Sequence, residues 1–327
     1  MAKETKKELN MSYPLVSILC AVYNHEPYLR QCLDGFVMQR AFYPIEVLIH
    51  DDASTDNSAN IIREYEAKYP GLFKALYQTE NKYSKGIDID TGIQFVRAKG
   101  KYIALCEGDD YWTDPLKIQK QVDFLESHED YVMCCTAFTQ SFEDDSQAKI
   151  TVSFDLDEIT IDDFLKGQWI GTLTAVFRKN AIDDYVVPFK GLPMGDLPLW
   201  GHLLLKGRIK YLNDITANYR RHECSASNPK DEKKGAAFDL AAMRVREYYA
   251  LSSNRIAVAA PSLKKNAQFI IDQAYANKRI GFLLEGFWHF LEEYGHPSGY
   301  DKLKRWGLKS NLNYFVSRII LRLKHKI

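Results

Sequence analysis

The sequence of 327 residues lacks the features that mark several common protein classes. It has no uninterrupted run of about 18 apolar residues, the length that a membrane-spanning helix needs. Its N-terminus is charged and has no continuous apolar stretch followed by a cleavage site, so we expect no signal peptide. Its six cysteines include no C-x-x-C pair and mostly lie in apolar, strand-like stretches, which predicts buried free thiols in a reducing cytosol.

The chain also lacks net charge, but its charges are distributed unevenly. It contains 43 basic and 43 acidic residues, and residues 302–327 hold eight of the basic residues and none of the acidic ones. In this tail, apolar residues recur at helical spacing from Leu312 to Leu323, with arginine and lysine between them. We therefore expect a basic amphipathic helix, which either binds an anionic membrane surface or packs on the acidic body of the protein.

The remaining composition, 46% hydrophobic and 13% aromatic, is sufficient for a large core, and the length predicts about two domains. Short β-branched runs alternate with helical periodicity over residues 13–227, which is typical of an α/β fold with a mostly parallel central sheet. We predict a charged tail at 1–12, this α/β domain at 13–227, a helical region at 228–301 and the basic tail at 302–327.

Hydrophobic periodicity predicts the individual elements of the α/β domain. Strands are expected at residues 15–22, 45–50, 72–77, 102–106, 132–139, 150–154, 172–178 and 208–212. Helices are expected at residues 28–39, 56–69, 87–98, 115–127 and 197–206, with two or three more between 236 and 294. No G-x-G-x-x-G motif follows the first strand, which disfavours a dinucleotide-dependent dehydrogenase.

Polar and acidic residues follow three of the predicted strands. Tyr23–Glu26 follows the first strand, Asp51–Asp56 the second, and Glu107–Asp110 the fourth. Ligands of open α/β sheets bind beyond the carboxyl ends of strands, so we expect these segments to form the site. Carboxylates that meet there repel one another unless a cation compensates, and oxygen ligands favour Mg²⁺ or Mn²⁺. In a purely structural alternative, Thr55 or Asp56 caps the next helix and Gly108 only forms a turn.

Three segments, Val16–Asn24, the strand ending in Asp51–Asp56, and Lys99–Asp110, resemble the signature segments of family 2 glycosyltransferases. Members of this family are inverting enzymes of the GT-A fold that use nucleotide-activated sugars. The resemblance covers about residues 13–227. The three motifs occur in the order and at the spacing found in the family, and this combination makes the resemblance specific.

The resemblance implies a set of donor-binding residues. Ala21 and Tyr23 are expected to line the nucleobase pocket, and Glu26 to approach the ribose. Asp52 is expected to accept a hydrogen bond from the base, which for uracil is its ring N–H. The implied donor is a nucleotide-diphosphate sugar, with a UDP-sugar favoured.

The resemblance also implies the metal-binding and catalytic residues. Asp109 is expected to face the ribose and the metal, and Asp110 to bind the Mn²⁺ or Mg²⁺ that bridges the two phosphates. His222 matches a position that approaches this metal or the diphosphate, and Arg220 is expected to stabilise the leaving diphosphate. Asp196 matches the catalytic carboxylate, since an inverting transfer needs one general base.

Two questions stay open from the sequence. Asp196 at a helix start is also explained as a helix-capping residue. Many members of the family carry an Ala-Arg-Asn run before the strand that leads to the acidic pair, and this chain lacks it. Lys82 or Lys85 is an alternative source of positive charge for the donor phosphates.

The resemblance therefore implies a metal-dependent hexosyl- or N-acetylhexosaminyltransferase for bacterial surface polysaccharide or glycolipid synthesis. The expected acceptor is a saccharide or a lipid-linked saccharide, and no nucleic-acid partner is expected. The expected location is the cytoplasm or the inner face of the membrane. The alternative is a non-catalytic nucleotide-sugar-binding or scaffold protein, which the presence of Asp109, Asp110 and Asp196 together disfavours.

Overall fold

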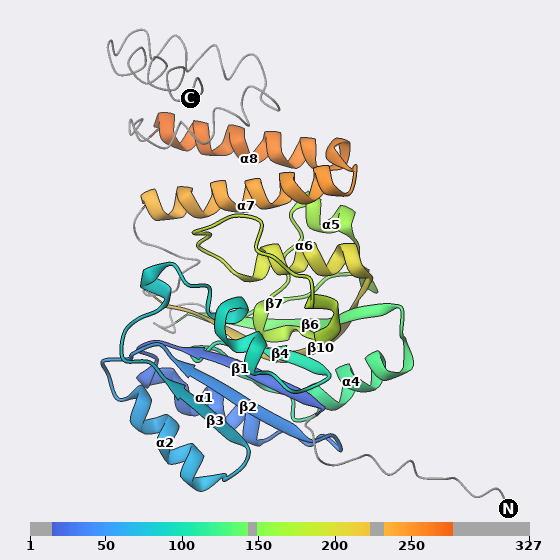
Figure 1. Cartoon of the computed structure of the whole chain (residues 1–327). Helices are drawn as coiled ribbons and strands as arrows, with labels where there is room; N and C mark the ends of the chain where they lie inside the picture. The colour runs from blue at the N-terminus through green and yellow to red at the C-terminus, as the bar shows by residue number, and fades with distance from the viewer. Residues whose placement is uncertain (1–14, 143–148, 223–231, 277–327) are drawn as a thin grey trace, which may run out of the picture. The chain divides into compact units, whose positions relative to one another are not determined.

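The computed structural model describes residues 15–142, 149–222 and 232–276, which belong to two compact units (Figure 1). The first unit contains the chain up to residue 164 and residues 168–229, and the second contains residues 165–167 and the chain from residue 230 onward. The predicted tails at 1–12 and 302–327 lie outside the described residues, so the amphipathic helix and its membrane role remain predictions.

A ten-stranded sheet organises the described part of the first unit. Its strands are β1 (Val16–Val22), β2 (Ile45–Asp51), β3 (Phe73–Tyr77), β4 (Tyr102–Leu105), β5 (Tyr111–Trp112), β6 (Tyr131–Phe142), β7 (Ile150–Val152), β8 (Glu158–Ile159), β9 (Val176–Arg178) and β10 (Arg208–Arg221). The order is β3-β2-β1-β4-β9-β6-β10-β5, with β7 beside β6 and β8 beside β10. The longest pairings, β1 with β2 and β6 with β10, are parallel, whereas β9 runs antiparallel to both β4 and β6.

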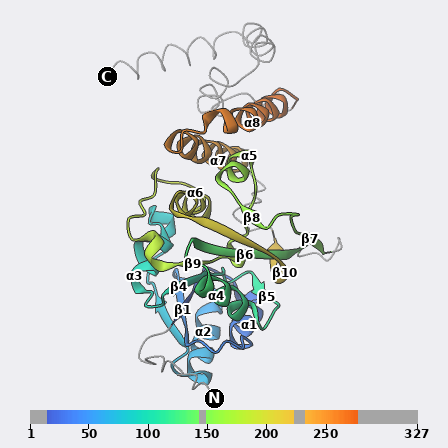
Figure 2. The same ribbon diagram turned by 90° about the vertical axis from the view of Figure 1, so that its right-hand side faces the viewer.

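Helices cover both faces of this sheet. The longer helices of the first unit are α1 (Glu26–Val37), α2 (Ser58–Lys68), α4 (Lys117–Ser127) and α6 (Asp196–Lys206). Apolar side chains of α1, α2 and α4 form one core cluster with alternate residues of β1, from Val16 to Val22. The helix α6 packs against β6 and β10 (Figure 2). The alternation of buried strands and amphipathic helices thus produces the layered α/β fold that the sequence predicts.

Most predicted elements before residue 128 are confirmed, with two corrections. The N-cap of α2 is Asn57, and neither Thr55 nor Asp56 caps this helix. Asp56 is not the N-cap residue, but its carboxylate accepts hydrogen bonds from the N–H of Ser58, the first residue of α2, and from the N–H of Glu26, both at 2.9 Å. The predicted helix at 87–98 is a π-helical turn (η2, Asp90–Gln94) followed by the short helix α3 (Phe95–Arg97).

Two later predictions were wrong in extent. The strand expected at 172–178 is a strand only from Val176, because the hydroxyl and N–H of Thr174 both donate to the Gly171 carbonyl and close a 3₁₀ turn (η3, Thr172–Thr174). The strand expected at 208–212 extends to Arg221. Register shifts on both sides of Ile215 interrupt the alternation of buried and exposed residues along β10. The sequence pattern therefore did not predict the second half of this strand.

The second unit contains the helices α7 (Glu232–Ser252) and α8 (Ile256–Ala276), which pack on each other. The sequence predicts two or three helices between residues 236 and 294, and α7 and α8 confirm two of them. The remaining part of that range lies outside the described residues. None of the helices in the described ranges is both long and apolar enough to cross a bilayer. The five cysteines at positions 20, 32, 106, 134 and 135 are buried free thiols as predicted, and Cys224 lies outside the described residues.

Lys117 is a charged side chain in the core beneath α4. It is fully buried, and its Nζ donates to the Thr174 carbonyl at 3.1 Å and to the Gln121 side chain. Burial lowers the pKa of Lys117 from 10.5 to about 8, because the ammonium group is poorly solvated there. At about 1.36 kcal/mol for each pKa unit, the charged form costs the folded state roughly 3 kcal/mol at neutral pH.

We expect Lys117→Met to raise the free energy of unfolding near pH 7 by roughly 1–2 kcal/mol, because the variant removes a buried charge while Gln121 Oε1 loses its donor. In the wild type, the unfolded chain binds the Lys117 proton more tightly than the folded chain between about pH 8 and pH 10.5. The free energy of unfolding of the wild type therefore increases as pH rises through this interval, and that of the variant does not show this increase. Urea unfolding at both ends of the interval measures the effect.

Lys101→Met, at a half-exposed lysine paired with Glu126, is the matched control and should change stability by less than about 0.5 kcal/mol. A clear loss of stability in Lys117→Met near pH 7 would mean that the ammonium group and its hydrogen bonds stabilise the fold.

Candidate active site

The loops that follow β1 and β2 are joined by hydrogen bonds. Asn24 Oδ1 accepts from the N–H of Thr55 at 2.7 Å, and the N–H of Asn24 donates to Ser54 Oγ at 3.0 Å. Asn24 and Ala53 both have left-handed backbones, with φ of 56° and 63°. Such conformations cost non-glycine residues energy and collect at functional sites. These loops are therefore held in one conformation at the carboxyl end of the sheet.

The first group of predicted donor-binding residues lies on the β1 loop. The carbonyl of Ala21 accepts a hydrogen bond from the N–H of Gly108 at 3.0 Å, which joins the first and third sequence motifs. Tyr23 is 45% exposed and thus accessible to a ligand. Glu26 Oε2 accepts from the N–H of Asn57 at 3.0 Å, so this carboxylate serves the start of α2.

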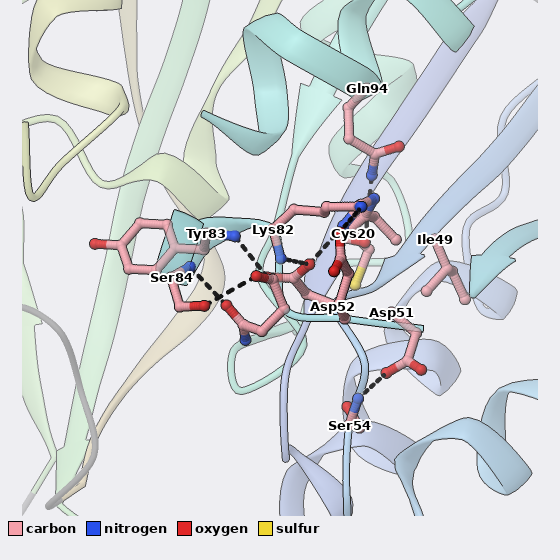
Figure 3. Close-up of polar contacts among 12 residues, drawn as sticks. Cys20, Ile49, Asp51, Asp52, Ser54, Lys82, Tyr83, Ser84 and Gln94 are labelled. Carbon is pink, nitrogen blue, oxygen red and sulfur yellow. Dashed lines mark hydrogen bonds and ion pairs between the residues drawn. The ribbon is translucent and has the colours of Figure 1, made fainter. Parts of the chain in front are cut away.

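Asp52 holds the turn at residues 82–86. Its side chain is only about 5% exposed; Oδ1 accepts from the N–H of Lys82 at 2.7 Å and Oδ2 from the N–H of Tyr83 at 3.0 Å (Figure 3). His50, fully buried, places Nε2 at 3.3 Å from Oδ1. A carboxylate oxygen can accept two hydrogen bonds, so Oδ2 retains capacity for one further donor.

The two lysines near this turn are paired with a carboxylate. Lys82 Nζ lies 2.6 Å from Glu80 Oε1, and Lys85 Nζ contacts Glu80 Oε2. Hydrogen bonds from Lys82 and Lys85 lower the pKa of Glu80 to about 2. One carboxylate balances only one of the two ammonium charges, so this cluster keeps a net positive charge, while Glu80 orients both lysine side chains.

Asp109 and His222 meet at the centre of the site. His222 Nε2 lies 2.9 Å from Asp109 Oδ2, and the Tyr28 ring lies against the His222 ring with centroids 4.8 Å apart. His25 Nε2 is 4.0 Å from the same Oδ2. Burial alone would raise the pKa of Asp109, but the hydrogen bond with His222 and the charges of both histidines lower it.

His25 was missed by the sequence reasoning, which gave it no role. The signal was its position in the polar segment Tyr23–Glu26 that follows β1. A side-chain carbon at Gly108 would lie 2.8 Å from His25 Nδ1 and 2.9 Å from Val22. Only glycine therefore fits between His25 and the acidic residues.

Asp110 and Arg220 are linked through the backbone. Asp110 is buried, and its Oδ1 accepts from the N–H of Arg220 at 2.8 Å. The Arg220 guanidinium donates to the Asp109 carbonyl and to the Gln31 side chain. It also lies 4.5 Å from the ring centroid of Tyr111 and 5.1 Å from that of Tyr28. The cation is therefore fixed in one orientation beside Asp109.

Three further carboxyl groups have raised pKa values. Burial and the charge of Asp109 raise the pKa of Glu107 to about 8. Burial, followed by the charges of Asp88 and Asp196, raises the pKa of Asp90 to about 7. Burial, followed by the charges of Asp109 and Glu107, raises the pKa of Asp110. Excess negative charge thus gathers here, as expected of a site that receives a cation.

Asp196 is the first residue of α6, and the N-cap is Gly195. Its Oδ2 accepts from the Thr172 hydroxyl at 3.1 Å, and its Oδ1 from the N–H of Leu197 at 2.7 Å. A side-chain carbon at Gly195 would lie 3.3 Å from Asp88 Oδ2, which places Asp88 beside the start of this helix. An acidic side chain suits this position, because O–H and N–H donors reach both oxygens of Asp196 and the positive end of the helix dipole lies beside them.

The donor set fits a divalent cation that is shared with a ligand. Asp109 and His222 offer one oxygen and one nitrogen close together. Within residues 15–142, 149–222 and 232–276, no group of three or more histidine, cysteine or acidic side chains is arranged to hold a metal ion by itself. Mg²⁺ in such sites binds one or two carboxylates and completes its shell with substrate phosphates and water. The residues therefore suit a metal that arrives with a diphosphate.

Several known proteins and one family model are similar to this chain in sequence. A model of glycosyl transferase family 2 matches residues 17–185, just over half of the chain. The Mycobacterium tuberculosis protein Rv1520 is 39% identical over 211 residues, which cover 63% of this chain and 59% of that protein. The Escherichia coli UDP-Glc:alpha-D-GlcNAc-diphosphoundecaprenol beta-1,3-glucosyltransferase WfaP is 28% identical over 218 residues, 66% of this chain and 81% of WfaP. The match thus spans less than two thirds of the length of the mycobacterial relative.

Two solved structures share the fold. The crystal structure of S. aureus TarS 1–349 in complex with UDP-GlcNAc has a TM-score of 0.65 and 18% identity, covering 85% of this chain and 80% of that 1–349 chain. The mannosyltransferase PcManGT from Pyrobaculum calidifontis, in complex with GDP-Man and Mn²⁺, has a TM-score of 0.53 and 14% identity, covering 94% and 84%. These likenesses confirm the GT-A-like fold expected from the sequence motifs.

Proposed function

Since the chain belongs to glycosyl transferase family 2, we propose that it moves a sugar from a nucleotide-diphosphate donor to an acceptor hydroxyl with inversion at the anomeric carbon. The observation that carries the proposal is the meeting of Asp109, His222 and Arg220 at the carboxyl end of the sheet, together with an Asp196 carboxylate that the Thr172 hydroxyl holds in place. Asp109, His222 and Arg220 have the chemistry to bind a diphosphate, and Asp196 supplies a base.

The loops after β1 and β2 are proposed to bind the nucleobase of the donor. Tyr23 offers an exposed ring and Asp52 Oδ2 retains capacity for one donor, which suits the ring N–H of uracil. Ala21 and Glu26 border the same loops. WfaP uses UDP-Glc and TarS binds UDP-GlcNAc, which supports a UDP-hexose or UDP-N-acetylhexosamine as donor.

Asp109 and His222 would hold Mn²⁺ or Mg²⁺, and Asp110, the further ligand that the sequence motif implies, would bind it through Oδ2, since its Oδ1 accepts from the N–H of Arg220. The ion would act as a Lewis acid on the diphosphate oxygens. The guanidinium of Arg220 adds a fixed positive charge where negative charge develops on the leaving group.

Asp196 is the general base. Its carboxylate takes the proton of the acceptor hydroxyl while that oxygen attacks the anomeric carbon, and the bond from this carbon to the diphosphate oxygen breaks with its electron pair leaving on the diphosphate. The Thr172 hydroxyl orients the carboxylate. A single base is sufficient, because inversion needs no covalent intermediate.

The acceptor is proposed to be a saccharide, free or linked to a lipid, in surface polysaccharide or glycolipid synthesis. WfaP acts on a sugar linked to diphosphoundecaprenol, which supports the lipid-linked class. A place at the inner face of the membrane would suit such an acceptor and remains a prediction.

The full chain should release nucleotide from a UDP-sugar in a panel of UDP-, GDP-, dTDP- and CDP-sugars, with Mn²⁺ or Mg²⁺ present and not after chelation. The reason is that Asp109 and His222 would supply only part of the ligands of a cation, so that oxygens of the diphosphate would be needed as well. Nucleotide binding without release from any donor would favour the scaffold alternative. Equal release after chelation would remove the metal from the proposal.

A further inference from the structure

Trp169 is a large aromatic side chain that the fold leaves 37% exposed. Its indole meets the Phe138 ring of β6 edge to face, with centroids 4.9 Å apart and an interplanar angle of 86°. It meets the Tyr219 ring of β10 in the same way, at 5.7 Å and 85°. Two neighbouring strands thus hold the indole in place while a third of its surface remains open to a ligand.

The loop that carries Trp169 leads directly to the proposed base. A side-chain carbon at Gly171 would lie 3.0 Å from the Phe138 ring, so the loop packs on the same ring that supports Trp169. The next residue, Thr172, donates its hydroxyl to Asp196 Oδ2 at 3.1 Å. Three residues of extended chain span at most about 11 Å, so Trp169 lies near the base.

The second supporting ring connects Trp169 with the donor end of the site. Tyr219 precedes Arg220 on β10, and Arg220 donates to the Asp109 carbonyl. An acceptor sugar must lie between the base and the anomeric carbon of the donor. Trp169 is linked to this region by the chain segment that leads to Thr172, and its supporting ring Tyr219 belongs to the strand that also carries Arg220.

The charges around the base restrict the sugar that fits there. Asp88, Asp90 and Asp196 lie close enough for the charges of Asp88 and Asp196 to act on Asp90. A uronic acid or another anionic sugar would be repelled by these carboxylates. A neutral pyranose offers hydroxyl groups to them, and its C–H face is apolar enough to stack on an indole ring.

We propose that Trp169, supported by Phe138 and Tyr219, is the acceptor-binding platform, which stacks on the C–H face of a neutral pyranose and presents its hydroxyl to Asp196. This inference rests on the proposed glycosyltransferase function and assigns its acceptor class. Phe138 and Tyr219 act as positioning residues that fix the orientation of the indole ring.

The test is the acceptor KM of the full-length protein, measured by nucleotide release from the active donor with p-nitrophenyl glycosides of neutral hexoses, N-acetylhexosamines and uronic acids as acceptors. Trp169→Ala should raise the KM for the neutral glycosides at least tenfold, which corresponds to about 1.4 kcal/mol. The Kd for the nucleotide diphosphate and acceptor-independent donor hydrolysis should stay within about twofold, because Trp169 is not among the residues assigned to the donor. Trp169→Phe, which keeps the ring packing, should give an intermediate KM.

Phe42→Ala, at an exposed aromatic residue before β2, is the matched control and should leave all three quantities unchanged. The platform is refuted if Trp169→Ala keeps the wild-type acceptor KM, or if it weakens donor binding as much as acceptor binding. If Trp169→Ala does not fold, a wild-type acceptor KM in Trp169→Phe refutes it as well. Preference for uronic acids refutes the acceptor class. Failure of the wild type to release nucleotide from any donor contradicts the proposed function itself.

Discussion

Asp196→Asn is expected to lower the rate of sugar transfer by about 10²–10⁴-fold, the usual contribution of a general base. The amide cannot accept the acceptor proton, but it can still accept the Thr172 hydroxyl that Oδ2 binds at 3.1 Å. The start of α6 should therefore keep its structure, and the loss should appear in kcat. Steady-state nucleotide release with saturating donor and acceptor measures it.

The proposed role of Asp196 also predicts what the variant retains. Its Kd for the nucleotide diphosphate with Mn²⁺ should match the wild type, since Asp109 and His222 are unchanged. Asp184→Asn, which removes an exposed carboxylate paired with Lys206 at the other end of α6, is the control and should keep wild-type kcat. Wild-type transfer in Asp196→Asn would mean that this carboxylate only serves the helix start.

Asp109→Asn is expected to have the second-largest effect, a loss of about 10²–10³-fold in kcat/KM. The neutral amide can keep the hydrogen bond with His222, now 2.9 Å long, but it is a poor ligand for a hard cation. The Mn²⁺ concentration needed for half-maximal activity should rise strongly. Nucleotide binding in the presence of Mn²⁺, measured by calorimetry, should weaken in parallel.

Asp123→Asn, at an exposed carboxylate of α4 that accepts from Tyr43 and Gln119, is the control for loss of one negative charge. It should leave the Mn²⁺ dependence unchanged. If Asp109→Asn required no more Mn²⁺ than the wild type, the cation would have to be assigned to other residues, and the proposed donor geometry would be wrong.

The sequence predicts the fold well because two local signals agree along the first 127 residues. Buried strands such as β1 are continuous apolar runs, and helices such as α4 carry apolar residues at helical spacing. The prediction was wrong where local interactions override the pattern. The Gly171 carbonyl closes a 3₁₀ turn in place of a strand, and the register shifts around Ile215 conceal the second half of β10.

The candidate site was predictable where the residues follow strand ends in order, as Asp52, Asp109 and Asp110 do. Other residues depend on contacts between distant segments. Thr172 meets Asp196 across 24 positions, and His25 reaches Asp109 across 84, so no local pattern reveals either one. The side chain of Asp52 illustrates the converse: its position was predictable, but its two hydrogen bonds to the turn at 82–83 were not.

The central claim is that one carboxylate and one displacement transfer the sugar with inversion. The most direct measurement is the configuration of the new glycosidic bond, read from the anomeric proton coupling in the ¹H NMR spectrum of the product. With an α-linked UDP-hexose as donor and an acceptor glycoside that the protein uses, we predict a β-linked product. An α-linked product would contradict the account, because retention needs a second step that Asp196 alone does not supply.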